Sequence, residues 1–171
     1  ESFFENVALL QAMQQAKRKD AALHLMGLVS DGGVHSHLRH LSGLLEMAAR
    51  QGVPRVRLHV FTDGRDTSPK SARRFLAALE KPLARAGAAI ATVSGRYYAM
   101  DRDKRWDRVA RAYQALVFSS GLRAESAEDA VAEAYGRGET DEFIQPTVVT
   151  ADGEPVGPIR DGDAVVFFNF R

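Results

Sequence analysis

The chain has 171 residues, of which 45% are hydrophobic and 26% are charged, a composition typical of one soluble globular domain. No apolar run approaches the roughly 20 residues that a membrane-spanning helix needs, and the acidic opening segment lacks the features of a signal peptide. The absence of cysteine excludes disulfides, thiolate metal sites and a cysteine nucleophile. We therefore expect a cytoplasmic protein that has no membrane partner.

Charge is distributed unevenly along the chain. Residues 50–111 contain fifteen Lys and Arg against six Asp and Glu, whereas residues 112–171 contain four basic residues against eleven acidic ones. The basic middle predicts an anionic ligand, and the acidic final third argues against a continuous nucleic-acid surface. Solvated helix faces are the alternative explanation for most of the individual charges.

The first third of the chain alternates helix-like and strand-like segments. Ser2 and Glu5 have capping-box spacing ahead of apolar residues at helical intervals, which predicts a first helix from there. A short apolar run predicts a buried strand over residues 23–30, and a helix is expected over 37–50. The next strand is expected over 56–62.

The same alternation continues to the end of the chain. A helix is expected over residues 70–86, with Pro69 in its first turn, where proline is tolerated. The remaining predicted elements are a strand over 88–94, a loop over 95–103, helices over 104–118 and 126–135 with Ser126 as N-cap, and strands over 146–150 and 163–170.

Three repeats of strand, loop and helix indicate parallel strands joined by right-handed crossovers. We therefore predict a three-layer α/β/α sandwich with a mostly parallel, mixed sheet. The absence of repeats and linkers predicts one domain over residues 1–171. In such sheets ligands bind beyond the carboxyl ends of the strands, where the first three predicted loops lie.

The loop after the first strand has the sequence Ser30-Asp-Gly-Gly-Val-His-Ser-His37. Its paired glycines let backbone amides approach an anion, the next helix adds positive partial charge, and His35 could hydrogen-bond an oxyanion. A tight turn with an exposed histidine explains the motif equally well. A metal site formed by His35, His37 and His40 is a third possibility, but nothing in the spacing enforces a ligand geometry.

The loop after the second strand contains Asp63, Arg65 and Asp66. A carboxylate next to an arginine on a loop that contains glycine can serve as a general base beside a cation that binds an anionic substrate. Taken alone, the motif favours a surface turn whose arginine and aspartate pair with each other.

The third motif, residues 94–108, places Arg96 and Arg102 on a loop with two tyrosines. Guanidinium groups bind carboxylate or phosphate in a bidentate manner, so these two arginines are candidate ligand-binding residues. Trp106 is predicted to pack in the core or to act as a hydrophobic anchor. Solvated helix positions are predicted for Lys104, Arg105 and Arg108.

The two ends of the chain predict that it was cut from a longer protein. An apolar strand stops at Asn169-Phe170-Arg171, and the first residues begin a helix without an initiator methionine.

Five stretches together are similar to one family. They read GLVSDGGVHSH, FTDGRDTSP, SGRYYAMDRDKRWDR, DEFIQPT and VVFFNFR, and the similarity runs over residues 2–171. The chain resembles the phosphoglycerate mutases that need no bisphosphoglycerate. This resemblance implies a two-domain enzyme in which the chain is the substrate-binding insert of a metallophosphatase-like domain. The other domain would hold two Mn²⁺ ions and a serine that becomes phosphorylated, and the whole enzyme is expected to be monomeric.

The resemblance also implies roles for particular residues. The reaction would interconvert 3-phosphoglycerate and 2-phosphoglycerate in glycolysis and gluconeogenesis, and Asp66 matches the carboxylate that shuttles the proton of the substrate hydroxyl. Because the serine, the metal ligands and further substrate-binding residues lie outside this chain, the chain alone is expected to be inactive and to bind no metal. The positions that match substrate-binding residues are His35, Arg65, Asp66, Arg96, Arg102 and Arg171.

Two other functions fit the residues. A stand-alone module that binds a phosphorylated metabolite would explain the basic loops equally well. A self-sufficient metallohydrolase would instead use His35, His37, Asp63 and Asp66, and its activity would depend on added metal.

Overall fold

The computed structural model describes residues 3–18 and 20–171, and within them the strands form one mixed sheet. The strand order is β4-β5-β3-β2-β1-β7, and β6 pairs with β5 outside this path. The strands are β1 (Leu23–Leu28), β2 (Val56–Thr62), β3 (Ala88–Gly95), β4 (Leu122–Ala124), β5 (Thr147–Ala151), β6 (Glu154–Pro155) and β7 (Ala164–Phe167).

The sheet is mostly parallel. Strands β3, β2, β1 and β7 run parallel to one another, β5 is antiparallel to β3, and β4 is parallel to β5. The helices are α1 (Val7–Ala16), α2 (Leu38–Gln51), α3 (Ala72–Ala86), α4 (Arg96–Ala99), α5 (Trp106–Phe118) and α6 (Ala127–Gly136). Two short 3₁₀-helices, η1 (Phe3–Glu5) and η2 (Asp141–Phe143), complete the elements. The predicted fold class is confirmed.

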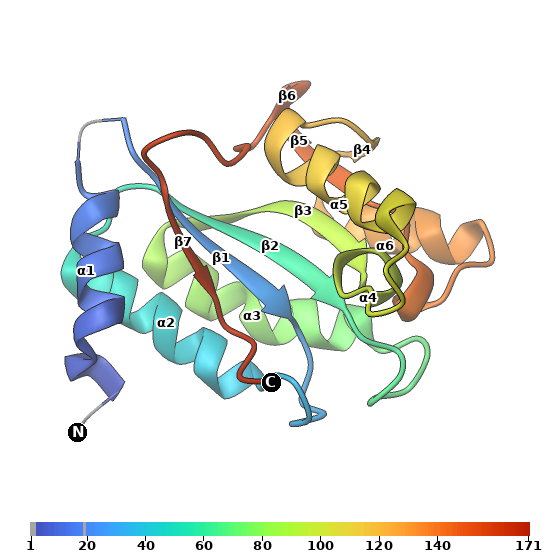
Figure 1. Ribbon diagram of the computed structural model, residues 1–171, viewed down its shortest axis with the longest axis horizontal. Helices are drawn as coiled ribbons and strands as arrows, with labels where there is room; N and C mark the ends of the chain where they lie inside the picture. The colour runs from blue at the N-terminus through green and yellow to red at the C-terminus, as the bar shows by residue number, and fades with distance from the viewer. Residues whose placement is uncertain (1–2, 19) are drawn as a thin grey trace.

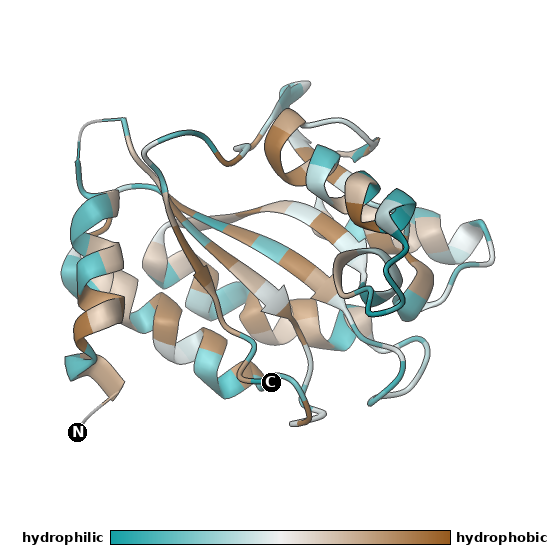
Figure 2. Ribbon diagram, viewed as in Figure 1, coloured by the Kyte–Doolittle hydropathy of each residue, from teal (hydrophilic) through white to brown (hydrophobic). Residues whose placement is uncertain are grey.

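Helices flank both faces of the sheet (Figure 1). Helices α2 and α3 pack against each other and, with α1 and α6, cover one face, whereas α4 and α5 lie on the opposite face near β3 and β5. Hydrophobic and polar positions alternate along the central strands (Figure 2). On β2 the buried Leu58 and Val60 join the helix-covered core, while the intervening His59 faces the other side.

Several element boundaries differ from the sequence prediction. Helix α3 begins at Ala72 rather than residue 70, so Pro69 precedes the helix instead of forming its first turn. Helix α5 begins at Trp106, after a turn in which Lys104 has a positive φ of 59°. At the start of the chain Asn6 caps α1 by accepting a hydrogen bond from Leu9 N–H, and Ser2 of the expected capping box lies outside the described residues.

The sequence prediction missed α4, β4 and β6, which are four residues or shorter. The last strand also ends at Phe167, three residues earlier than expected. No helix among the described residues is both long and apolar enough to cross a lipid bilayer.

Candidate functional site

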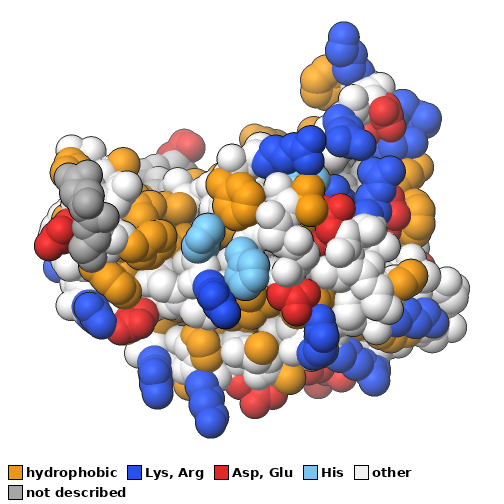
Figure 3. Space-filling view, turned by 90° about the horizontal axis from the view of Figure 1, so that it is seen from below, with side chains coloured by type: hydrophobic (Ala, Val, Ile, Leu, Met, Phe, Trp, Pro, Cys, Tyr) orange, Lys and Arg blue, Asp and Glu red, His pale blue; other side chains and the backbone are white. Residues whose placement is uncertain are grey.

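The three motif loops meet at the carboxyl ends of the parallel strands. The loop after β1 brings His35, the loop after β2 brings Arg65, and α4, directly after β3, brings Arg96 to one open pocket of about 280 Å³. Arg102 lines the same pocket. From below, Lys and Arg side chains gather around a few acidic ones on the surface of the molecule (Figure 3). The arrangement follows from topology, because parallel strands end on the same edge of a sheet.

Arg96 is the central cation of the pocket, and its side chain is only 7% exposed. Its Nη1 donates to Asp63 Oδ1 at 2.8 Å and to Asp66 Oδ2 at 2.7 Å, and its Nη2 donates to His35 Nε2 at 3.0 Å. Burial lowers the pKa of Arg96, but the bonds to Asp66 and Asp63 outweigh it and raise the pKa above its ordinary value. A guanidinium has five N–H donors, so two remain for a ligand.

Asp63 is the buried carboxylate that pairs with Arg96. Its carboxylate is fully buried and accepts hydrogen bonds from Ser30 Oγ at 2.7 Å and from the backbone N–H groups of Arg65 at 3.2 Å and Asp66 at 3.0 Å. Burial raises the pKa of Asp63, but these bonds and Arg96 outweigh it, so the pKa lies below its ordinary value. The Arg–Asp pair predicted within one surface turn is therefore wrong, because Asp63 pairs with Arg96 instead of Arg65.

His35 is held as a neutral imidazole. Because a guanidinium can only donate, His35 Nε2 accepts from Arg96 and the ring proton is assigned to Nδ1. Burial and the charge of Arg96 lower the pKa of His35, which outweighs the opposite effect of Asp66. The 3.8 Å approach of His35 Nε2 to Asp66 Oδ2 is therefore a contact rather than an ion pair.

The other three predicted arginines lie at the rim. Arg65 pairs with Glu142 at 3.4 Å, and Arg102 is exposed on the pocket lining. Arg171 is near enough to lower the pKa of His35, and the adjacent Phe170 N–H donates to His35 O at 2.8 Å. All six predicted binding residues thus lie at one edge, with Arg96 buried and the others around it.

Helix η2 forms one wall of the pocket, which requires glycine at two places. A Cβ on Gly95 would lie 2.3 Å from Glu142 O, and one on Gly64, where φ is +70°, would lie 2.7 Å from Glu142 N. The absence of these side chains lets Glu142 and Phe143 reach the pocket lining. Helix η2 consists of the first three residues of the DEFIQPT motif, but no local sequence pattern predicts that this segment packs beside the pocket.

Asp141 fixes η2 to the rest of the site. Its fully buried carboxylate accepts from Ser71 N–H at 2.8 Å, from Ala72 N–H at 2.9 Å and from the Tyr135 hydroxyl. The first two bonds cap α3 from a distant part of the chain, which explains why Ser71 makes no side-chain cap. Thr62 Oγ1 also donates to Asp141 O at 2.6 Å, which joins η2 to the end of β2.

One prediction for residues 104–108 is wrong. Arg108 lines the pocket instead of being solvated: its guanidinium lies 3.9 Å from the Tyr97 ring centroid and 3.4 Å from Asp101 Oδ1, and its side chain is 15% exposed. Trp106 is 71% exposed, so it does not pack in the core, and its alternative role as a hydrophobic anchor stays a prediction. Lys104 and Arg105 are exposed as predicted.

The remaining histidines of the first motif serve other contacts. His37 caps α2 by accepting from Arg39 N–H at 3.1 Å, and His40 stacks on Phe3 and meets Phe170 edge to face. Among the described residues, no group of three or more His, Cys, Asp or Glu is arranged to hold a metal ion. The geometry therefore gives no support to the metal site formed by His35, His37 and His40.

Comparison with known proteins assigns this arrangement to a family. Residues 1–171 match the family model described as the BPG-independent PGAM N-terminus. The chain belongs to this family. The resemblance drawn from the five motifs is thus confirmed.

Members of the BPG-independent mutase family match the chain along almost its whole length. A 2,3-bisphosphoglycerate-independent phosphoglycerate mutase of Desulforudis audaxviator is 58% identical over 99% of this chain and 34% of its own length. The protein of the same name from Moorella thermoacetica is 56% identical over 99% of this chain and 33% of its own length. The chain therefore spans about a third of the length of these curated relatives.

A solved structure shares the fold. The crystal structure of Leishmania mexicana phosphoglycerate mutase at low cobalt concentration superposes with a TM-score of 0.90 at 35% sequence identity, over 97% of this chain and 32% of that one. This BPG-independent PGAM N-terminus therefore has the same arrangement of strands and helices as a part of that mutase.

Proposed function

We propose that the chain is the substrate-binding domain of a 2,3-bisphosphoglycerate-independent phosphoglycerate mutase, and that it orients phosphoglycerate while the rest of the enzyme moves the phosphoryl group. The main support is the environment of Arg96. This buried cation has two unused N–H donors and lies beside carboxylates, a neutral imidazole and further arginines. Phosphoryl transfer depends mainly on positioning and on neutralising anionic oxygens, which such a pocket supplies. Catalysis requires the remaining two thirds of the protein.

The substrate carries a carboxylate and a phosphate, and the pocket offers donors for both. Arg96 keeps one Nη2 hydrogen and its Nε hydrogen for a ligand, since Asp63, Asp66 and His35 occupy the other positions. His35 keeps its Nδ1 hydrogen, for which the described residues provide no partner. Three arginines at the rim, Arg65, Arg102 and Arg171, add positive charge that would attract the anionic substrate.

Asp66 is suited to move a proton. Its Oδ2 is bound to Arg96, whereas its Oδ1 makes no hydrogen bond to any described residue, and the side chain is 23% exposed. The free oxygen can accept the proton of the substrate hydroxyl that takes up the phosphoryl group, and can give it to the oxygen from which the phosphoryl group has departed. The position of the carboxylate is set by Arg96 and by the backbone bond to Asp63.

Two Mn²⁺ ions and a nucleophilic serine belong, in this proposal, to the part of the enzyme outside this chain. When bound, the metal would neutralise charge on the transferred phosphoryl group. The described residues here offer no fitting ligand cluster, so this domain would contribute substrate contacts only. We further propose that the whole enzyme is a cytoplasmic monomer that binds neither nucleic acid nor membrane.

The proposal is tested by NMR titration of the isotope-labelled 171-residue chain with 3-phosphoglycerate, with sulfate as control. We expect saturable shifts at His35, Asp66 and Arg96 that require less 3-phosphoglycerate than sulfate. Arg96→Gln should weaken 3-phosphoglycerate binding at least about tenfold, because a charge-assisted hydrogen bond contributes about 1.5–3 kcal/mol. Arg123→Gln, a change far from the pocket, should leave it unaltered.

Two results would contradict this proposal. Equal, weak shifts with both anions would reduce the pocket to a general anion surface. In the full-length enzyme, near-normal turnover of Asp66→Asn would remove the proton-shuttle role.

A further inference from the structure

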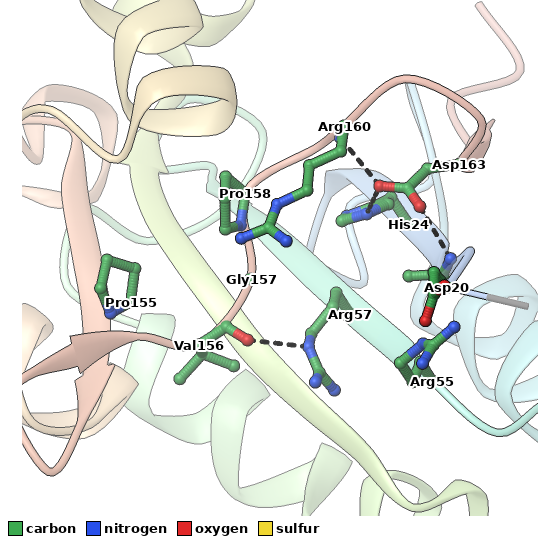
Figure 4. Close-up of a pocket in the computed structure, with 11 residues that line it drawn as sticks. Asp20, His24, Arg55, Arg57, Pro155, Val156, Gly157, Pro158, Arg160 and Asp163 are labelled. Carbon is green, nitrogen blue, oxygen red and sulfur yellow. Dashed lines mark hydrogen bonds and ion pairs between the residues drawn. The ribbon is translucent and has the colours of Figure 1, made fainter.

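A second pocket lies at the opposite edge of the sheet, beside the amino ends of β1 and β2. Its volume is about 330 Å³, and its polar lining includes Arg55, Arg57, Arg160 and His24 (Figure 4). Because β1 has six residues and a strand rises about 3.3 Å per residue, about 20 Å of sheet separates the two pockets. The proposed function gives this second pocket no role.

Two arginines of this pocket are held through their Nε atoms, which leaves terminal guanidinium nitrogens available to a ligand. Arg55 Nε donates to Ala21 O at 2.8 Å, and Arg57 Nε donates to Val156 O at 3.0 Å. A Cβ on Gly157 would lie 2.8 Å from Arg57 Nε, so glycine permits this close approach. Apart from one 3.2 Å bond from Arg57 Nη1 to the Val56 carbonyl, the terminal nitrogens of both arginines have no hydrogen-bond partner among the described residues.

Arginines outnumber carboxylates in this pocket, which is lined by Arg55, Arg57 and Arg160 and by two carboxylates, Asp20 and Asp163. Within residues 3–18 and 20–171, Arg55, Arg57 and Arg160 form no ion pair. Burial lowers the pKa of Arg57, and the nearby charge of Arg55 lowers it further. Asp20 lines the pocket without forming an ion pair to these arginines.

The second carboxylate of the pocket is already engaged. Asp163 accepts hydrogen bonds from the backbone N–H groups of Ala22 and Arg160, each at 2.8 Å, and from His24 Nε2 at 3.0 Å. In Figure 4 the Asp163 side chain points toward His24, and the Arg160 guanidinium lies on the same side of the hollow as Gly157. An incoming anion would therefore meet three guanidinium groups and one carboxylate, that of Asp20, which forms no ion pair with a described residue.

We propose that this pocket binds a small phosphate-bearing anion through Arg55, Arg57 and Arg160. Guanidinium groups match the oxygens of phosphate in bidentate geometry, and three of them can serve a tetrahedral oxyanion better than a planar carboxylate. The pocket volume admits a phosphate monoester with a few carbons as well as inorganic phosphate. The chemistry common to both sources is a dianionic phosphoryl group.

The test follows the side-chain Nε–Hε signals of Arg55 and Arg57 in the 171-residue chain while inorganic phosphate is added, with sodium chloride at matched ionic strength as the reference. We expect saturable shifts with phosphate only. Arg160→Gln should weaken binding about tenfold, since one charge-assisted contact is lost. The Arg160 side chain makes no hydrogen bond to the described residues, so this change should leave the fold intact. Arg123→Gln is the matched control, because it removes an exposed arginine elsewhere.

Shifts that match those with chloride, or an Arg160→Gln variant that binds phosphate as well as Arg123→Gln, would overturn the proposal. Signals of His35 and Arg96 report the first pocket separately, so binding there leaves this test unaffected. A parallel titration with glycerol 3-phosphate distinguishes the sources. Tighter binding than inorganic phosphate would identify a monoester as the ligand, and equal binding would show that the phosphoryl group alone suffices; both support the pocket.

Discussion

Asp63 determines the geometry of the first pocket although no ligand role is proposed for it. It is fully buried, binds Arg96 and accepts two backbone N–H groups of its own loop. Because the same Arg96 nitrogen also binds Asp66, the position of the proposed proton shuttle depends on Asp63. A single buried carboxylate thus orients both the central cation and the candidate base.

Asp63→Asn is therefore expected to destabilise the chain and to weaken ligand binding together. Removing the charge leaves a buried guanidinium with one ionic partner, and breaking a buried ion pair costs about 3 kcal/mol. Urea unfolding measures the loss. Asp103→Asn is the control, because that side chain is 74% exposed and its ion pair with Arg108 spans 3.7 Å; it should change the unfolding free energy by less than about 1 kcal/mol. Equal losses in both variants would contradict the role of Asp63.

Sequence motifs indicated residues at the edge of the sheet where the pocket lies more readily than the residues that hold them in position. Arg96 and Asp66 were found because unusual residue types cluster after predicted strands. The sequence does not predict which arginine pairs with Asp63. Arg65 is closer in sequence and equally suitable as a cation, and only the pairing of strands in the sheet brings Arg96 to Asp63. Arg108 was misjudged for a related reason, since its stacking on Tyr97 depends on the turn between α4 and α5.

At the scale of elements, the wall formed by η2 depends on a close backbone approach. Gly95→Ala would place a Cβ 2.3 Å from the Glu142 carbonyl oxygen, and backbone cannot move aside as a side chain can. We expect a loss of about 2 kcal/mol in the unfolding free energy and altered NMR signals for Glu142 and Phe143.

Gly136→Ala is the matched control for this glycine substitution. Gly136 ends α6 and its added Cβ would meet nothing within 4 Å, so alanine should be neutral or slightly stabilising. Unchanged signals of η2 in Gly95→Ala would show that the added Cβ does not displace η2, which would contradict the close approach.

The central elements were predictable and the peripheral ones were not. Strands β1, β2 and β3 are apolar runs that end at loops, and their parallel pairing follows from the helices between them. The antiparallel pairing of β5 with β3 has no comparable signal, because a long connection permits either direction. The start of α3 also depends on Asp141, a cap about 70 residues away that no local pattern contains.

At the scale of the whole molecule, a chain of hydrogen bonds crosses the sheet. His24 Nε2 lies 3.0 Å from Asp163, His24 Nδ1 lies 2.9 Å from His59 Nε2, and His59 Nδ1 lies 2.9 Å from Thr92 Oγ1. If Asp163 accepts, each histidine has one donor and one acceptor, so both rings are neutral. Burial and the adjacent His24 lower the pKa of His59 to about 3, and burial lowers that of His24 despite Asp163.

These two neutral, buried histidines predict that the free energy of unfolding falls as the pH is lowered below 6.5, the ordinary pKa of histidine. Between that value and about 3, the unfolded state holds a proton on His59 that the native state does not, so each lower pH unit costs about 1.4 kcal/mol. His24 and His35, whose pKa values are also lowered, add to the slope. Below pH 3.8 Asp63 and Asp163, with lowered pKa values, add a further loss as they become protonated.

Guanidinium unfolding at a series of pH values between 4 and 7 measures this slope. His59→Gln should reduce it by up to one proton, whatever it does to stability at pH 7, because glutamine does not titrate. His40→Gln, which replaces an exposed histidine, should leave the steep acid slope in place. If His59→Gln and the parent chain lose stability in parallel over this range, then His59 is protonated in the folded state and the neutral pair does not exist. The difference in slope between His59→Gln and the parent chain thus tests, without any ligand, whether the buried His59 ring is neutral in the folded state.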